Sequence, residues 1–155
     1  MDLISLATVV AACNTPNPEP APGVQCTYEG TLHLLREFFR LYDLRELDFL
    51  MALFHNPSSR LQYRDEVIRN VADVRDFGAL RAYFQQRFAR GDRLRLREIQ
   101  LLQFEGPRPT SSPVASFARE STEGRQCGSG KFVCEGGRFV QVIMSSRLAV
   151  EGNCS

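Results

Sequence analysis

The sequence has almost no excess of charge of either sign. Its 19 lysine and arginine residues are nearly balanced by 18 acidic residues, which gives a formal net charge of +1. Proteins that bind nucleic acid or an acidic membrane surface usually carry a clear basic excess. The composition therefore argues against a nucleic-acid partner.

The chain is also poor in histidine and in the motifs of nucleophilic and phosphate chemistry. It contains two histidines, His33 and His55, so a serine or cysteine triad has little to draw on. There is no glycine-rich phosphate loop, no GxSxG motif and no CxxC pair. We therefore predict neither a metal site nor a cofactor.

An apolar run opens the sequence, but it is too short to span a bilayer. It covers residues 3–12 and ends in Val-Ala-Ala before Cys13. Its length suits the apolar region of a signal peptide, and its end resembles a bacterial lipobox, in which the cysteine is acylated after cleavage. We interpret residues 1–12 as a signal-like segment and Cys13 as a lipidation site, although the initial Met-Asp supplies no positive charge. The alternative is a buried N-terminal strand or helix.

Residues 13–25 are rich in proline. Four prolines alternate with other residues in the stretch NTPNPEPAPG, which favours an extended chain that cannot join a helix or the interior of a sheet. We predict a semi-rigid tether between a lipid anchor and a single domain at residues 26–155. The protein is then expected to be extracytoplasmic and anchored to a membrane.

Five cysteines leave an even number if Cys13 carries lipid. An oxidising compartment could pair the other four in three ways. The sequence is compatible with a staple between the ends of the domain, Cys26–Cys154, and with a small loop closed by Cys127–Cys134. It does not choose among the pairings.

Two consecutive helices are predicted between residues 31 and 56, where apolar residues recur at helical spacing with one short interruption. Asp43 and Glu46 have the spacing of a capping box, so the second helix is expected to begin at Asp43. A third helix is predicted over Asp76–Arg90, with one apolar face formed by Phe77, Leu80, Phe84 and Phe88.

The last third of the chain alternates apolar and polar residues as antiparallel strands do. In residues 93–104 this alternation changes parity around Glu98, which predicts a β-bulge. Residues 67–75 and 122–130 are expected to be irregular or turn-rich. Further strands are predicted at 59–66, 114–120, 131–134 and 139–147, the last two as a hairpin. The pattern predicts an α+β fold in which a bent sheet covers helices.

Three segments resemble a known family. Phe38-Phe39, Leu50–Phe54 and Leu80–Phe84, with a strand between the last two, look like the nuclear transport factor 2-like superfamily, which includes ketosteroid isomerases and scytalone dehydratase. The resemblance covers about residues 27–148. It implies three N-terminal helices packed in the concave face of a strongly curved antiparallel or mixed sheet, as a cone with a pocket at its open end. It also implies that a homodimer can form through the sheet and that many members have no demonstrated activity.

We expect a non-catalytic domain that binds a small hydrophobic molecule or a protein partner. Four residues are predicted to line a pocket because they are aromatic or polar groups within apolar patterns: Tyr63, Phe88, Arg119 and Gln141. The alternative is a small acid–base enzyme, of isomerase or dehydratase type, that acts on a hydrophobic substrate.

The enzyme hypothesis has no matching sequence motif. The epoxide-hydrolase branch of the superfamily resembles a site with an arginine between two aspartates, whereas here Arg119 adjoins Glu120 and no aspartate follows Asp92. This absence counts against that chemistry. Glu98, Arg119 and Glu120 are interpreted as solvated strand charges, with a place in a pocket as the alternative. Whether the protein is an enzyme stays open at this point.

Overall fold

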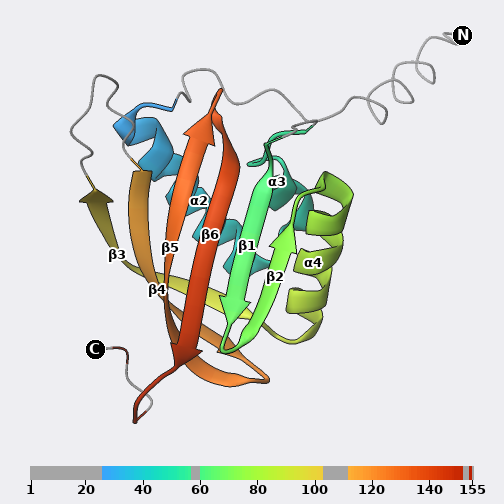
Figure 1. Cartoon of the computed structure of the whole chain (residues 1–155), viewed down its shortest axis with the longest axis vertical. Coiled ribbons are helices and arrows are strands. Elements are labelled where there is room, and N and C mark those ends of the chain that lie inside the picture. The colour runs from blue at the N-terminus through green and yellow to red at the C-terminus, as the bar shows by residue number, and fades with distance from the viewer. Residues whose placement is uncertain (1–25, 57–59, 103–111, 152–153, 155) are drawn as a thin grey trace, which may run out of the picture.

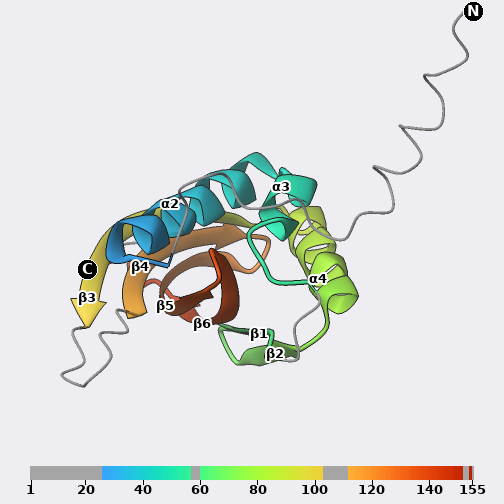
Figure 2. The same ribbon diagram turned by 90° about the horizontal axis from the view of Figure 1, so that it is seen from above.

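One sheet of six strands and three helices make up the described part of the chain. The computed structural model describes residues 26–56, 60–102, 112–151 and 154. The signal-like segment, the tether and Cys13 lie outside the described residues, so the interpretations made for them stay predictions. Figure 1 faces the sheet with helix α2 behind it, and Figure 2 shows the sheet curving beneath the helices.

Helix α2, Tyr28–Leu44, covers the concave face of the sheet. It begins where the Thr27 hydroxyl accepts a hydrogen bond from the backbone N–H of Gly30 at 3.1 Å. It ends where Arg45 adopts a left-handed conformation with φ of 58°. The apolar spacing of this segment therefore predicted the helix correctly.

The second helix is shorter than predicted and begins later. Helix α3 covers Leu47–Met51 only, and the predicted start at Asp43 is wrong. Asp43 lies inside α2, where its carboxylate accepts a hydrogen bond from Arg93 Nε at 2.9 Å instead of capping amide groups. The left-handed Arg45 separates the two helices, and apolar spacing alone carries no signal for it.

The third predicted helix is confirmed as α4, Phe77–Ala89. Asp76 caps it by accepting a hydrogen bond from the backbone N–H of Ala79 at 2.9 Å. Leu80 and Phe84 point into the core and are fully buried. Among the helices in the described residues, none is both long and apolar enough to cross a membrane.

The sheet has the strand order β2-β1-β6-β5-β4-β3. Strands β1 and β6 pair in parallel, and the other neighbouring pairs are antiparallel. The architecture is thus the α+β fold expected, with three helices against the concave face of a curved mixed sheet. The strands are β1 Gln62–Val67, β2 Asn70–Val74, β3 Arg93–Leu102, β4 Ser112–Ser121, β5 Gly124–Glu135 and β6 Arg138–Leu148.

Two segments that were predicted to be irregular are strands. β2 lies within residues 67–75, and its side chains are largely exposed, so no apolar alternation marks it. The first half of β5 contains glycines that resemble turn residues but allow close packing: a Cβ on Gly128 would lie 2.4 Å from the ring of Phe117. The predicted bulge in β3 is confirmed between Leu96 and Glu98.

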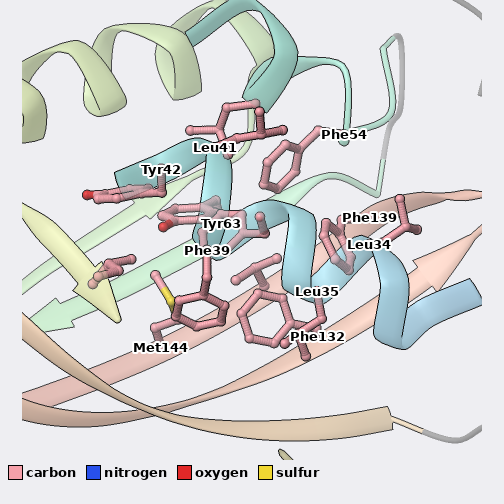
Figure 3. Close-up of a cluster of buried hydrophobic side chains, with 14 of the residues drawn as sticks. Leu34, Leu35, Phe39, Leu41, Tyr42, Phe54, Tyr63, Phe132, Phe139 and Met144 are labelled. Atoms are coloured by element: carbon pink, nitrogen blue, oxygen red, sulfur yellow. The ribbon is translucent and has the colours of Figure 1, made fainter. Parts of the chain in front are cut away.

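Aromatic side chains fill the space between α2 and the sheet, as Figure 3 shows. Phe38 lies at the centre, and its ring centroid is 6.3 Å from that of Phe54, 5.4 Å from Phe132 and 6.4 Å from Phe139. All four rings are fully buried, and burial of each contributes about 1.5–3 kcal/mol to folding. The concave face around Phe38 is therefore occupied by the protein's own side chains.

Two disulfides are present, and they differ from both pairings that the sequence suggested. Cys26 pairs with Cys134 and Cys127 pairs with Cys154, with Cα–Cα distances of 5.5 and 5.3 Å. Cys127 and Cys134 lie on the same strand, roughly 24 Å apart along extended backbone, which excludes the small loop. The Cys26–Cys134 bridge lies beside Gly137 of the β5–β6 turn, whereas Cys154 lies beside Gln126 at the start of β5. Cys26 and Cys154 therefore lie near opposite ends of β5, too far apart for a disulfide between them.

Candidate functional site

Four buried charged side chains meet between the sheet and the helices α2 and α4, and we call them the inner charge cluster. Asp65 on β1, Arg119 on β4 and Asp92 just before β3 are each 0% exposed, and Arg87 on α4 is 4% exposed. Two carboxylates and two guanidinium groups make the cluster neutral. Burial of an unpaired charge is costly, so the geometry of the pairing decides whether this arrangement is stable.

Arg119 lies between the two aspartates. Its Nη2 and Nη1 atoms donate to Asp65 Oδ2 and Oδ1 at 2.7 and 3.1 Å, a two-point pairing of guanidinium and carboxylate. Its Nε atom lies 3.4 Å from Asp92 Oδ1 on the other side. Nη1 also donates to the Ser146 hydroxyl at 3.1 Å. The interpretation of Arg119 as a solvated strand charge is therefore wrong.

Asp92 is held by side chains from both long helices. It accepts hydrogen bonds at Oδ2 from the Tyr42 hydroxyl at 2.6 Å and from Arg87 Nε at 2.9 Å. Arg87 Nη1 in turn donates to Glu123 Oε1 at 2.7 Å, in the turn between β4 and β5. The cluster thus ties α2 and α4 to the sheet.

Asp65 has a second donor in Tyr83 of α4, whose hydroxyl lies 2.8 Å from Asp65 Oδ2. Burial raises the pKa of the Tyr83 hydroxyl, and the neighbouring Asp65 carboxylate raises that pKa further. Burial alone would lower the pKa of Arg119, but the carboxylates of Asp65 and Asp92 outweigh it, so the pKa lies above its usual value. Tyr83 therefore stays a neutral donor and Arg119 stays a cation throughout the physiological pH range.

A small cavity reaches the edge of this cluster. It has a volume of about 130 Å³ between β2, α4 and the β4–β5 turn, and its wall includes Tyr83, Arg87, Arg90 and Glu123. Asp65 and Asp92 have no exposed surface, so a molecule in this cavity touches their partners and not the carboxylates. In the described part of the chain, no three His, Cys, Asp or Glu side chains gather as metal ligands.

The four residues predicted to line a pocket do not meet in one place. Tyr63 is fully buried in the core, and its hydroxyl has no hydrogen-bond partner among the described residues. Phe88 packs at the core edge, with its ring centroid 5.1 Å from that of Tyr42. Gln141 alternates with the inward residues of β6 and donates to Gln62 Oε1 at 2.8 Å. Of the four, Arg119 alone belongs to the inner charge cluster.

The sequence analysis concluded that this chain lacks an arginine between two aspartates, and that conclusion is also wrong. It looked for an aspartate after Asp92, whereas the partners of Arg119 are Asp92 itself and Asp65, which lies earlier in the chain. A signal was present, because Asp65 and Arg119 each share the strand parity of buried apolar neighbours. Two strands that each place a charge of opposite sign on their apolar face would have predicted this buried pair.

Comparison with known proteins identifies the fold. No protein-family model and no curated protein matches the chain. Among solved structures, an NTF2-like protein of unknown function from Cytophaga hutchinsonii is similar over 80% of this chain and 93% of its own, with 10% identity and a TM-score of 0.55. This chain therefore has the nuclear transport factor 2-like cone fold.

Two further structures with this fold are described as enzymes. An epoxide hydrolase/cyclase-like enzyme of pyran ring formation in the polyether salinomycin is similar over 83% of this chain and 97% of its own, with 14% identity and a TM-score of 0.57. An LEH-like epoxide hydrolase from M. tuberculosis is similar over 75% and 81%, with 12% identity and a TM-score of 0.51. At these identities the likeness establishes the fold and leaves the activity open.

Proposed function

We propose that this chain is a non-catalytic, extracytoplasmic binding domain, tethered to a membrane through a lipid on Cys13. The observation that carries the non-catalytic part is the complete burial of Asp65, Asp92 and Arg119. A general acid or base must come within hydrogen-bond distance of its substrate. In the inner charge cluster both carboxylate oxygens of Asp65 and Oδ2 of Asp92 accept hydrogen bonds from side chains of the protein itself. The remaining oxygen, Asp92 Oδ1, has no hydrogen-bond partner among the described residues, but it is buried and lies 3.4 Å from Arg119 Nε.

Two observations support a location outside the cytoplasm. The pairs Cys26–Cys134 and Cys127–Cys154 both have disulfide geometry, and structural disulfides persist mainly in oxidising compartments. The remaining cysteine, Cys13, follows an apolar run and precedes the proline-rich tether. One lipidated cysteine and two disulfides account for all five cysteines.

The packing of the cone favours a protein partner over a small hydrophobic molecule. Phe38, Phe84 and Phe132 fill the interior next to α2 and α4 and are fully buried. An apolar ligand there would have to displace these rings, and the loss of their packing would cost more than a small ligand returns. The outer surface of the domain is therefore the better binding region.

The anchor can be tested by mass spectrometry of the protein made in a bacterial host from its full gene. We expect a membrane-bound protein whose N-terminal residue is Cys13 bearing a diacylglyceryl group. A Cys13→Ala variant should be released from the membrane fraction. An uncleaved, unmodified N-terminus would contradict the proposal.

A small acid–base enzyme acting on a hydrophobic substrate is the second candidate. The observation that favours it is the Asp65–Arg119–Asp92 arrangement with a tyrosine hydroxyl on each carboxylate. Structures with the same fold are described as epoxide hydrolases, and hydrolysis of an epoxide needs one acid and one base.

Turnover of a panel of apolar epoxides by the full chain separates the two candidates. The binding-domain proposal predicts no turnover above the uncatalysed rate. Turnover that disappears in Asp92→Asn, while a thermal melt shows that the variant is folded, would establish the enzyme instead. An Arg36→Gln variant on the exposed face of α2 serves as the matched control, because it leaves the cluster unchanged.

A further inference from the structure

The outer face of the sheet carries a depression lined by arginines, and the proposed function gives this depression no role. Three adjoining hollows of about 500, 470 and 310 Å³ border the Cys127–Cys154 disulfide. Their floor includes the outward serines Ser116, Ser129 and Ser145. Their rim carries four arginines, Arg95, Arg97, Arg125 and Arg147, and two glutamates, Glu98 and Glu120. We call this region the arginine hollow.

The strand register explains why the region is hollow. Ser116 of β4 lies opposite Ser129 of β5, which lies opposite Ser145 of β6. Three short side chains in one row across the sheet leave a depression where larger residues would fill it. In the next row, Ala118 and Cys127 lie between Arg95 of β3 and Arg147 of β6. The Cys127–Cys154 disulfide lies in this row, so the hollows flank it, with Arg95 at one end of the row and Arg147 at the other.

The charges of the rim are only partly neutralised. Arg125 Nε lies 3.3 Å from Glu120 Oε1, and Arg97 donates to the backbone carbonyl oxygen of Cys154. Arg95 and Arg147 are exposed, and neither has an ion-pair partner among the described residues. The chain as a whole is almost neutral, so this local excess of positive charge is a property of the face and not of the composition.

The spacing of Arg95 and Arg147 suits an anionic partner whose charges are separated. The two residues are three strand spacings apart in one row, roughly 14 Å. Acidic residues four positions apart along an extended peptide are also separated by roughly 14 Å, so each guanidinium can pair a carboxylate of its own at two points. One small anion held between the two long side chains would have to serve both.

We infer that the arginine hollow binds an extended acidic segment of a partner protein. A second copy of this chain would face the same arginines across a two-fold axis, and like charges disfavour that pairing. Cys127, which borders the hollow, lies near the start of β5, and β5 begins at the end of the sheet opposite to the start of α2 (Figure 1). The inference rests on the proposed function in one respect, that the partner is a protein outside the cytoplasm.

Fluorescence anisotropy with a fluorescein-labelled (Glu-Thr)5 peptide and the full chain tests the inference. The informative variant is Arg95→Glu/Arg147→Glu. Its matched control is Arg36→Glu/Arg69→Glu, which changes net charge equally at exposed positions outside the hollow. We expect salt-sensitive binding that weakens at least about tenfold in the first variant and less than about twofold in the control.

Several results would overturn the inference. The first is equal weakening in both variants, which would mean that only net charge matters. The second is equal binding of a (Gln-Thr)5 peptide. The third is tighter binding of a heparin fragment, which would point to an anionic polysaccharide. The fourth is a dimer in sedimentation velocity that Arg95→Glu/Arg147→Glu dissociates. Failure of the peptide to bind would leave the test of Cys13 and the turnover assay unaffected, so the two proposals fail separately.

Discussion

Arginines on the two faces of one sheet have opposite environments in this protein. On β4, Arg119 points inward, has no exposed surface and contacts two aspartates. One row of the outer face carries Arg95 and Arg147 in solvent. The partners of Arg119 are fixed by the fold, so its removal leaves Asp65 buried without a cation and Asp92 with Arg87 alone. Exposed arginines cost the fold little and remain available to another molecule.

The two disulfides should contribute differently to stability, because they close loops of different length. Cys26–Cys134 ties α2 to the sheet across 108 residues of chain, whereas Cys127–Cys154 closes 27 residues beside the arginine hollow. Chain entropy predicts a loss of about 4–5 kcal/mol for the Cys26→Ser/Cys134→Ser variant and about 3–4 kcal/mol for Cys127→Ser/Cys154→Ser. Guanidinium denaturation measures both values. A larger loss for the second variant would contradict the account.

Arg119→Met should lower the free energy of unfolding by about 3–5 kcal/mol, because Asp65 would stay buried without a cation and Asp92 would keep only Arg87. Arg95→Met is the matched control on the outer face and should change stability by less than about 0.5 kcal/mol. Urea denaturation of the pair gives the comparison directly. Similar values for both variants would remove the distinction between the two faces.

Two buried tyrosine hydroxyls in the core should differ in what they contribute to stability. Tyr42→Phe removes a donor to the buried Asp92 carboxylate and should cost about 1.5–3 kcal/mol. Tyr63→Phe removes a buried hydroxyl that has no partner among the described residues, so stability should stay the same or rise. Thermal melts of the two variants test this contrast. A loss in Tyr63→Phe as large as that in Tyr42→Phe would show that its hydroxyl has a role in the fold.

Glu123 lies at the solvent edge of the inner charge cluster. Its replacement should lower the free energy of unfolding by a small amount that depends on pH. Burial alone would raise the pKa of its carboxyl, but hydrogen bonds from Arg87 and Arg90 outweigh it, so the pKa falls below its ordinary value of 4.5. A lowered pKa in the folded state stabilises the protein above that ordinary value, and the contribution is lost as the pH falls through the folded pKa. Glu123→Gln should therefore cost about 1 kcal/mol at neutral pH.

Denaturation of the wild-type protein and Glu123→Gln at a series of pH values measures this effect. The difference in unfolding free energy should shrink as the pH falls below 4.5 and vanish in stronger acid. A difference that stays constant over the whole series would mean that the charge of Glu123 does not contribute.

Much of the fold follows from local patterns in the sequence. The apolar stripe of α4, the parity change at Glu98 and the β5–β6 hairpin are each confirmed. In that hairpin Gly136 and Gly137 take φ values of 59° and 79°, as the turn requires. These features depend on neighbours in the chain, and the sequence displays them directly.

The inner charge cluster depends on neighbours in space, and the sequence analysis missed it. Asp65 and Arg119 meet only because β1 pairs in parallel with β6 and the sheet then curves toward β4. The disulfides were missed for a related reason, since the first half of the strand that holds Cys127 and Cys134 apart was predicted to be turn-rich, and only residues 131–134 were predicted as a strand. Long-range pairing has no local periodicity from which it can be predicted.

Chemical labelling of arginines by phenylglyoxal, read out by peptide mass spectrometry, tests the central claim most directly. In the native protein, Arg95 and Arg147 should be modified, whereas Arg119 should stay unmodified until denaturant unfolds the chain. Modification of Arg119 at a rate similar to that of Arg95 under native conditions would contradict the account. It would show that a small molecule reaches the carboxylates that the structure buries, and it would favour the enzyme over the binding domain.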